Sequence, residues 1–138
     1  MIVTEYVDFQ TRGDGEMTDL TGKVAAAVDR SGLSAGAAVV FASGATGAIT
    51  TIEYEPGLVE DMKAALERIA PQDIEYAHNR RWGDGNGHSH IRASIIGPSL
   101  AIPFSDGKLM LGTWQQIVFI DLDTSPRYRR VVVQIIGE

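Results

Sequence analysis

Apolar residues recur at helical spacing in two segments of this chain. The first covers residues 18–32, where aliphatic side chains line one face and Gly32 occupies the position that usually follows a last helical turn. The second covers residues 56–69, with Pro56 in the first turn and Pro71 as the stop. The pattern therefore predicts two amphipathic helices.

Most of the remaining chain gathers apolar residues in short runs, which is typical of β-strands. Turn dipeptides at residues 97–98, 106–107 and 125–126 separate the later runs, and such short connections favour antiparallel hairpins. Strands, two helices and a final β-meander predict one α+β domain over residues 1–138 rather than a βαβ array. The predicted strands cover residues 2–10, 36–43, 47–54, 90–97, 99–104, 108–123 and 129–137.

Composition narrows the classes of protein. The 138 residues include 44% hydrophobic and 22% charged side chains, close to the average of globular proteins. A net charge of −6 argues against nonspecific binding to nucleic acid or to anionic membranes. No cysteine is present, so any metal site must use histidine, aspartate or glutamate. The first residues lack the pattern of a signal peptide, and we expect a cytoplasmic protein.

Two glycine-rich stretches invite comparison with phosphate-binding loops. Residues 44–50, GATGAIT, lack the lysine of a P-loop and lead into a strand-like run. Residues 83–87, GDGNG, lack the spacing of a dinucleotide-binding loop and open no predicted helix. Both motifs are therefore excluded, although backbone amides in such turns can still hold an anion.

All three histidines of the chain, His78, His88 and His90, fall in one short window. If a strand begins at Ser89, His88 and His90 point to the same face, because side chains alternate along a strand. Two imidazoles on one face, met by a third from the preceding segment, suit Zn²⁺ or a similar ion. The alternative is a solvated strand face that binds nothing. Candidate carboxylate ligands or general bases are Glu53, Glu55 and Asp84.

Arg92 continues the same alternation and would share that face. A guanidinium beside histidines suits an anionic substrate held by a cation, and pairing with a surface carboxylate is the alternative. Trp114 and Gln115 lie in a strand-like run, where the tryptophan packs in a core or interface by default and the glutamine amide can hydrogen-bond a site group. The basic residues 127–130 are typical of an exposed edge strand.

Residues 78–123 resemble the second half of the YjbQ-like family, also described as the secondary thiamine-phosphate synthase family. The shared signals appear in order: a histidine before a Gly/Asn-rich loop, N-x-x-x-H-I, G-P-S-L, I-P-x-x-D-G-K-L and L-G-T-W-Q. The resemblance implies an α+β fold in which a mostly antiparallel β-sheet wraps around a helix, a homotrimer, and a histidine-based metal site. The positions that match the family's site residues are Glu53, His78, Asn86, His90, Trp114 and Gln115.

One position departs from the family pattern. The family carries a histidine in an H-T-S/T-A segment, and the matching residues 44–47 read GATG, so a glycine stands at position 44. His88 can supply the missing imidazole if it shares a strand face with His90. Otherwise the site is degenerate and the activity is lost.

The activity that the resemblance implies joins an aminopyrimidine methyl pyrophosphate to a thiazole phosphate and releases pyrophosphate. That chemistry needs a divalent cation and cationic groups on the departing phosphates. The alternatives are a metal-dependent hydrolase with the same residues, and a non-catalytic trimeric module that binds a metal or an anion. The expected roles are ligation of a zinc- or magnesium-class ion by His78, His88 and His90, catalysis by Glu53, Arg92 and Gln115, and binding of a small phosphorylated molecule by Arg81, Asn86 and Trp114.

Overall fold

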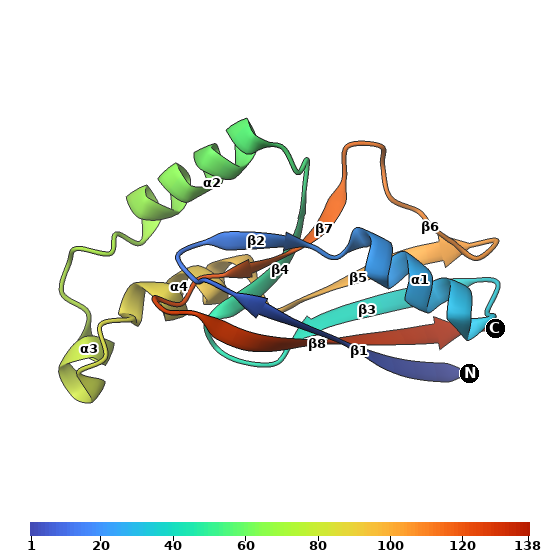
Figure 1. Ribbon diagram of the computed structural model, residues 1–138, viewed down its shortest axis with the longest axis horizontal. Helices are drawn as coiled ribbons and strands as arrows, with labels where there is room; N and C mark the ends of the chain where they lie inside the picture. The colour runs from blue at the N-terminus through green and yellow to red at the C-terminus, as the bar shows by residue number, and fades with distance from the viewer.

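The strands of the computed structural model, which describes all 138 residues, form two antiparallel sheets (Figure 1). The larger sheet has five strands in the order β1-β8-β3-β5-β6, and the smaller sheet has three in the order β2-β7-β4. The strands are β1 (Ile2–Thr11), β2 (Glu16–Asp19), β3 (Gly36–Ala42), β4 (Gly47–Ile52), β5 (Ser99–Ser105), β6 (Lys108–Leu109), β7 (Gln116–Asp121) and β8 (Arg127–Gly137).

Four helices complete the fold, and the first packs against strands of both sheets (Figure 1). The larger sheet curls around this helix, so the expected α+β fold, a mostly antiparallel sheet wrapped around a helix, is confirmed. No helix is long and apolar enough to cross a membrane. The helices are α1 (Thr21–Ser31), α2 (Pro56–Ile69), α3 (Ala77–Trp82) and α4 (Gly87–Ile96).

Strand β7 separates two hydrophobic cores. Its Ile117 and Phe119 point into the larger core, which holds α1 and the five-stranded sheet. Val118 and Ile120 point to the other side, where α2 and α4 cover the smaller sheet. Because side chains alternate along a strand, a run that is apolar at every position marks a strand buried on both faces. The sequence of β7 therefore places it in the centre of the molecule.

The first helix begins at Thr21 rather than at residue 18. The residues before it form β2, whose Met17 is buried against the second core. The side chain of Asp19 accepts a hydrogen bond from the backbone N–H of Thr21 at 2.9 Å. Gly32 has a left-handed φ of 70° directly after the helix, as its position in the sequence predicts.

The largest correction concerns residues 90–97, where the sequence predicts a strand and the structure has α4. The alternating apolar residues belong to a helix that exposes Ile91 and Ile95 and buries Ala93 against the smaller sheet. A run this short fits both periods, and its length cannot decide between strand and helix. The face assigned to His88, His90 and Arg92 by strand alternation is therefore wrong.

The start of α4 depends on contacts with the segment before it. A Cβ atom on Gly87 would lie 2.6 Å from the Cβ of Tyr76, so only glycine fits there. The backbone N–H of Gly87 donates to Oδ1 of Asn79 at 2.8 Å, and the carbonyl of Asn86 accepts the first helical hydrogen bonds. The short helix α3, which the sequence analysis does not predict, brings Tyr76 and Asn79 to this position.

The predicted strand over residues 108–123 is divided into β6 and β7. Trp114 and Gln115 lie in the connection between them, and the Trp114 side chain is 72% exposed. This tryptophan therefore has no place in either core of the chain, and core packing is excluded as its role.

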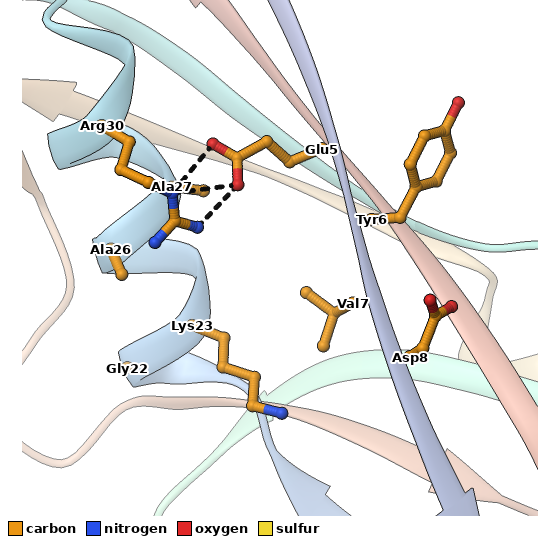
Figure 2. Close-up of a pocket in the computed structure, with 9 residues that line it drawn as sticks. All are labelled: Glu5, Tyr6, Val7, Asp8, Gly22, Lys23, Ala26, Ala27 and Arg30. Carbon is orange, nitrogen blue, oxygen red and sulfur yellow. Dashed lines mark hydrogen bonds and ion pairs between the residues drawn. The ribbon is translucent and has the colours of Figure 1, made fainter.

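A groove between β1 and α1 is bridged by one ion pair (Figure 2). Nη2 of Arg30 lies 2.6 Å from Oε1 of Glu5, and the Arg30 side chain is exposed whereas that of Glu5 is half-buried. Exposed pairs of this kind add little stability. None of the residues that line this groove has a buried side-chain nitrogen or oxygen atom without a partner.

Candidate functional site

Two imidazoles lie side by side where α3 meets α4. The rings of His78, from α3, and His90, from α4, have centroids 4.4 Å apart and planes inclined by 42°. Both residues are half-buried. Between the two helices the chain turns through Gly83 and Gly85, which adopt left-handed φ angles of 71° and 68°. These glycines let α3 fold back beside α4, so the loop brings His78 to His90.

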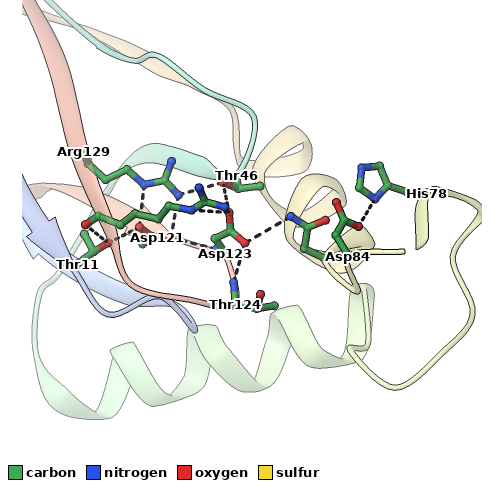
Figure 3. A network of polar contacts seen from close by, with 10 residues as sticks. Thr11, Thr46, His78, Asp84, Asp121, Asp123, Thr124 and Arg129 are labelled. Atoms are coloured by element: carbon green, nitrogen blue, oxygen red, sulfur yellow. Dashed lines mark hydrogen bonds and ion pairs between the residues drawn. The ribbon is translucent and has the colours of Figure 1, made fainter. Parts of the chain in front are cut away.

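A carboxylate lies behind the first of these rings. Oδ1 of Asp84 is 3.3 Å from Nδ1 of His78 (Figure 3). The two atoms are close enough for an ion pair, but they are not aligned for a hydrogen bond. Nδ1 of His78 is therefore buried without a hydrogen-bond partner. A carboxylate on Nδ1 orients a histidine so that Nε2 is the nitrogen left for a metal ion.

The third histidine points elsewhere. Successive residues of a helix are turned by about 100° from one another, so His88 and His90 lie on nearly opposite faces of α4. His88 is only 2% exposed, and burial, followed by the charge of Arg92, lowers its pKa below the ordinary value. No group of three or more histidine, aspartate or glutamate side chains converges in a way that could hold a metal ion. His88 therefore does not replace the histidine missing at position 44.

Arg92 lies on the His88 face of α4 and fastens that helix to α2. Its Nε donates to the carbonyl of Ala70 at 2.9 Å, and its Nη2 donates to Oε2 of Glu67 at 2.6 Å. The hydrogen bond from Arg92 holds the pKa of Glu67 below its ordinary value. Of the two roles open to Arg92, pairing with a carboxylate is the one the structure contains.

A hollow lies beside His90 at the position where the resemblance places a histidine. Its volume is about 170 Å³, and Gly44, Ala45, Ser94 and His90 are among the residues that line it. A Cβ atom added at Gly44 would lie 3.6 Å from Nη1 of Arg129 and would meet no other atom within 4 Å. The glycine thus leaves open the space that a third imidazole would fill.

Next to this hollow is a buried polar network that the sequence analysis missed (Figure 3). Nε and Nη2 of Arg129 donate to the carboxylate of Asp121 at 2.8 and 2.9 Å, and Thr11 donates to the same group. Burial alone would raise the pKa of Asp121, but the hydrogen bonds from Arg129 and Thr11 outweigh it, and the pKa lies below its ordinary value. Strand β8 lies between β1 and β3, so the prediction that the basic residues 127–130 belong to an exposed edge strand is wrong.

The network continues through Asp123 towards the imidazoles. Thr46 donates to Oδ2 of Asp123 at 3.0 Å. One orientation of the buried Asn86 amide donates to Oδ1 of Asp123 at 3.4 Å, and the rotated orientation places its nitrogen 3.0 and 3.1 Å from the oxygens of Asp84. We prefer the rotated orientation because its contacts are shorter. In that orientation Asn86 bonds the carboxylate beside His78 and no longer donates to Asp123.

The remaining predicted site residues lie at the other end of the smaller sheet. Gly47 pairs with Asp121 at the imidazole end, and Ile52 pairs with Gln116 at the far end. Six strand residues span roughly 17–20 Å. Glu53, Trp114 and Gln115 are exposed at that far end, with Gln115 donating to Thr51 at 3.2 Å. One chain therefore does not bring them to the imidazoles.

Arg81 is close to His78 in the sequence, and its side chain is exposed. It belongs to α3, and its guanidinium carbon lies 5.4 Å from the ring centre of Trp82. The guanidinium lies over the indole ring of Trp82, which has no negative charge to neutralise it. Arg81 thus keeps its charge available for an anion.

The molecule is a small α+β protein in which two imidazoles lie side by side where α3 meets α4. Comparison with known families gives its place among them: the family model described as UPF0047 protein YjbQ-like matches residues 5–138. The chain belongs to this YjbQ-like family.

Relatives and solved structures agree over the full length. A UPF0047 protein of Methanothermobacter thermautotrophicus is 36% identical over 137 residues, which cover 99% of this chain and 94% of the relative. A crystal structure of a YbjQ-like protein of unknown function from Sulfolobus solfataricus covers 100% of both chains with a TM-score of 0.90 and 31% identity. An uncharacterized protein of the family from Clostridium acetobutylicum covers 96% of this chain and 99% of its own, with a TM-score of 0.87 and 39% identity.

Proposed function

We propose that His78 and His90 bind a divalent metal ion together with a small phosphorylated molecule, and that the chain acts as a thiamine-phosphate-synthase-like transferase. The observation that carries the proposal is the half-buried imidazole pair, 4.4 Å between ring centres, with Asp84 behind His78. Imidazole ligands favour a zinc-class ion over a magnesium-class ion.

Two imidazoles are too few for a closed structural site and are one short of the three protein ligands of an open catalytic site. Structural zinc sites use four protein ligands, whereas catalytic sites use three and leave a position open. Here two imidazoles are in place, and the Asp84 carboxylate 3.3 Å from Nδ1 of His78 could orient that ring once the two groups align. The hollow at Gly44 gives space for a phosphate oxygen or water in place of a third imidazole.

The protein residues contribute orientation and charge. Asn86 holds Asp84 from the side of the buried network. Arg81 supplies the cation for the departing pyrophosphate, because Arg92 is held by Glu67 and Ala70. A bound divalent ion would add Lewis-acid stabilisation of the same leaving group.

A homotrimer is part of the proposal. Glu53, Trp114 and Gln115 match family site positions, yet in one chain they lie a strand length from the imidazoles. A neighbouring copy can bring its own far end to the pair, and the 72% exposed Trp114 would then be covered. Sedimentation equilibrium of the wild type and of Trp114→Ala tests this, with a monomeric wild type as the contradicting result.

The metal is tested by elemental analysis and by calorimetric titration with Zn²⁺. We expect His78→Ala and His90→Ala to lose binding and His88→Ala, on the opposite face of α4, to keep it. Equal zinc affinity in all four proteins, or none in the wild type, would refute the metal site.

The transferase is tested separately by incubation with the two thiamine precursors and Mg²⁺ or Zn²⁺. We expect thiamine phosphate from the wild type and none from His90→Ala. No product from a wild type that does bind metal would reject the transferase and leave the second candidate, a non-catalytic metal- or anion-binding module. That candidate is favoured by the glycine at position 44.

A further inference from the structure

A second hollow lies between α2 and α4, on the side of α4 opposite to His90. Its volume is about 220 Å³, below the usual range for pockets that hold drug-sized molecules. Leu66, Ile120 and Leu122 supply apolar lining from α2 and from the end of β7. The hollow therefore suits a small metabolite with an apolar part.

A buried polar atom without a partner lies in this lining. His88 is 2% exposed, and its Nδ1 forms no hydrogen bond within the protein. Buried nitrogen atoms of this kind are rare, because native proteins pair almost all of them. The His88 side chain is among those that line the hollow, and Nδ1 itself is closed to solvent, so a ligand group takes the missing bond when the ring turns towards the hollow.

Further polar groups of the hollow are also incompletely bonded. Arg92 uses Nε and Nη2 on Ala70 and Glu67, and its Nη1 has no protein acceptor. Lys63 forms no ion pair, and the Asp14 carboxylate accepts no hydrogen bond, whereas Glu67 already accepts from Arg92 and from the backbone of Gln72. The unused groups are thus donors of Lys63, Arg92 and His88, the carboxylate of Asp14, and the side-chain amide of Gln72.

We propose that this hollow binds a small zwitterion, an α-amino acid with an apolar side chain. Lys63 and Arg92 carry positive charge, and Asp14 and Glu67 carry negative charge, so the lining is neutral as a whole. A phosphate dianion would leave the hollow strongly negative, whereas a zwitterion keeps it neutral.

The unused groups match both ends of such a ligand. The carboxylate of the amino acid accepts from Nδ1 of His88, Nη1 of Arg92 and the Lys63 ammonium. Its ammonium donates to Asp14, and its side chain lies on the apolar lining. This site is independent of the imidazole pair, because His88 and His90 lie on opposite faces of α4.

The test is calorimetric titration of the full chain in EDTA with leucine, methionine and phenylalanine. Two analogues of leucine, 4-methylpentanoate without the ammonium and 3-methylbutylamine without the carboxylate, test whether both charges are read. We expect at least one of the three amino acids to bind. If leucine binds, its two analogues should bind at least about tenfold more weakly than leucine does. If methionine or phenylalanine binds instead, its own analogues without the ammonium or the carboxylate are compared in the same way. No binding by any of the three, or equal binding by the analogues, would overturn the proposal.

Variants locate the binding. Lys63→Met and Asp14→Asn change exposed side chains, so both should fold, and asparagine tolerates the positive φ of 53° at position 14. Each should weaken binding about tenfold, while Lys23→Met in the groove of β1 and α1 should leave it unchanged. Histidine NMR in the wild type should show the His88 ring shifting on titration and the His78 and His90 rings unmoved. Binding that survives both variants, or a shift confined to His78 and His90, would refute this location.

Discussion

Two groups of buried polar side chains meet at the imidazole end of the molecule, and they differ in how fully they are bonded. Around Asp121 every polar group has partners: Arg129, Thr11 and Thr46 satisfy one another and the carboxylate. By contrast, all of the buried side-chain nitrogen and oxygen atoms without a partner lie in residues 78–89. They are His78 Nδ1, His88 Nδ1 and Ser89 Oγ.

The difference separates structure from function. A satisfied buried network holds a fold together, and removing one member leaves a costly orphan. A buried group without a partner costs free energy instead of adding stability, so its presence supports the proposal that a ligand takes the missing bond. We therefore assign Asp121 and Arg129 to the framework, and the histidines to binding.

The largest expected effect is on the framework. Arg129→Met leaves the Asp121 carboxylate buried without its cation, and loss of one partner of a buried pair costs about 3–5 kcal/mol. Urea unfolding followed by circular dichroism measures this loss. If Arg129→Met unfolds at the wild-type urea concentration, the network is not what holds this end of the molecule.

A double variant sharpens that result. Asp121→Leu combined with Arg129→Met removes both charges, and we expect it to be more stable than Arg129→Met alone. Additive losses would show that the two side chains do not act as a pair.

The next effect is on the binding group. Asp84→Ala removes the carboxylate behind His78, and loss of such an outer partner lowers metal affinity about 10- to 100-fold. Because Asp84 is exposed, the loss in the free energy of unfolding should be limited to its hydrogen bond with Asn86, about 1 kcal/mol. Zinc titration and urea unfolding on the same preparation measure both, with Asp73→Ala as an exposed control. Unchanged zinc affinity would place Asp84 outside the site.

The acid stability of the chain follows from the lowered pKa of Asp121. A group whose pKa is lower in the folded state stabilises the fold above its unfolded pKa of about 3.9, and the stabilisation is lost as the pH falls towards its folded pKa. In that window one such group gives a slope of up to about 1.4 kcal/mol per pH unit.

Asp121→Asn should lower the free energy of unfolding at neutral pH. It should also flatten the slope of that free energy against pH below about pH 4. The exposed control Asp73→Asn should keep the wild-type slope. Parallel curves for the wild type and Asp121→Asn, measured by urea unfolding at several pH values, would contradict the bonding assigned to Asp121.

Much of the fold could be predicted because its signals are local. Residues 117–120 of β7 are all apolar and are buried on both faces, and Pro56 and Gly32 lie where the helices begin and end. The face of α4 could not be predicted, since it depends on Tyr76 and Asn79 closing on Gly87 from outside the segment.

For the candidate site, too, the sequence predicted some of the contacts and missed others. The family pattern singled out His78 and His90, which the structure brings together, because an ordered motif carries information that periodicity does not. Strand alternation added His88 and Arg92 to them and was wrong, since the period was wrong. Asp121 and Arg129 escaped notice because pairing across β7 and β8 cannot be read from a charge pattern.

The smallest effect separates an orphaned polar group from a bonded one. His88→Leu replaces the buried imidazole by an apolar side chain, and no hydrogen bond of Nδ1 is lost. We expect an unfolding free energy within about 1 kcal/mol of the wild type, or slightly above it. The same change at Asp121 leaves Arg129 without its carboxylate and should cost several-fold more. If His88→Leu destabilises the chain as strongly as Asp121→Leu, then the imidazole belongs to the framework, and burial without a partner is no guide to binding in this protein.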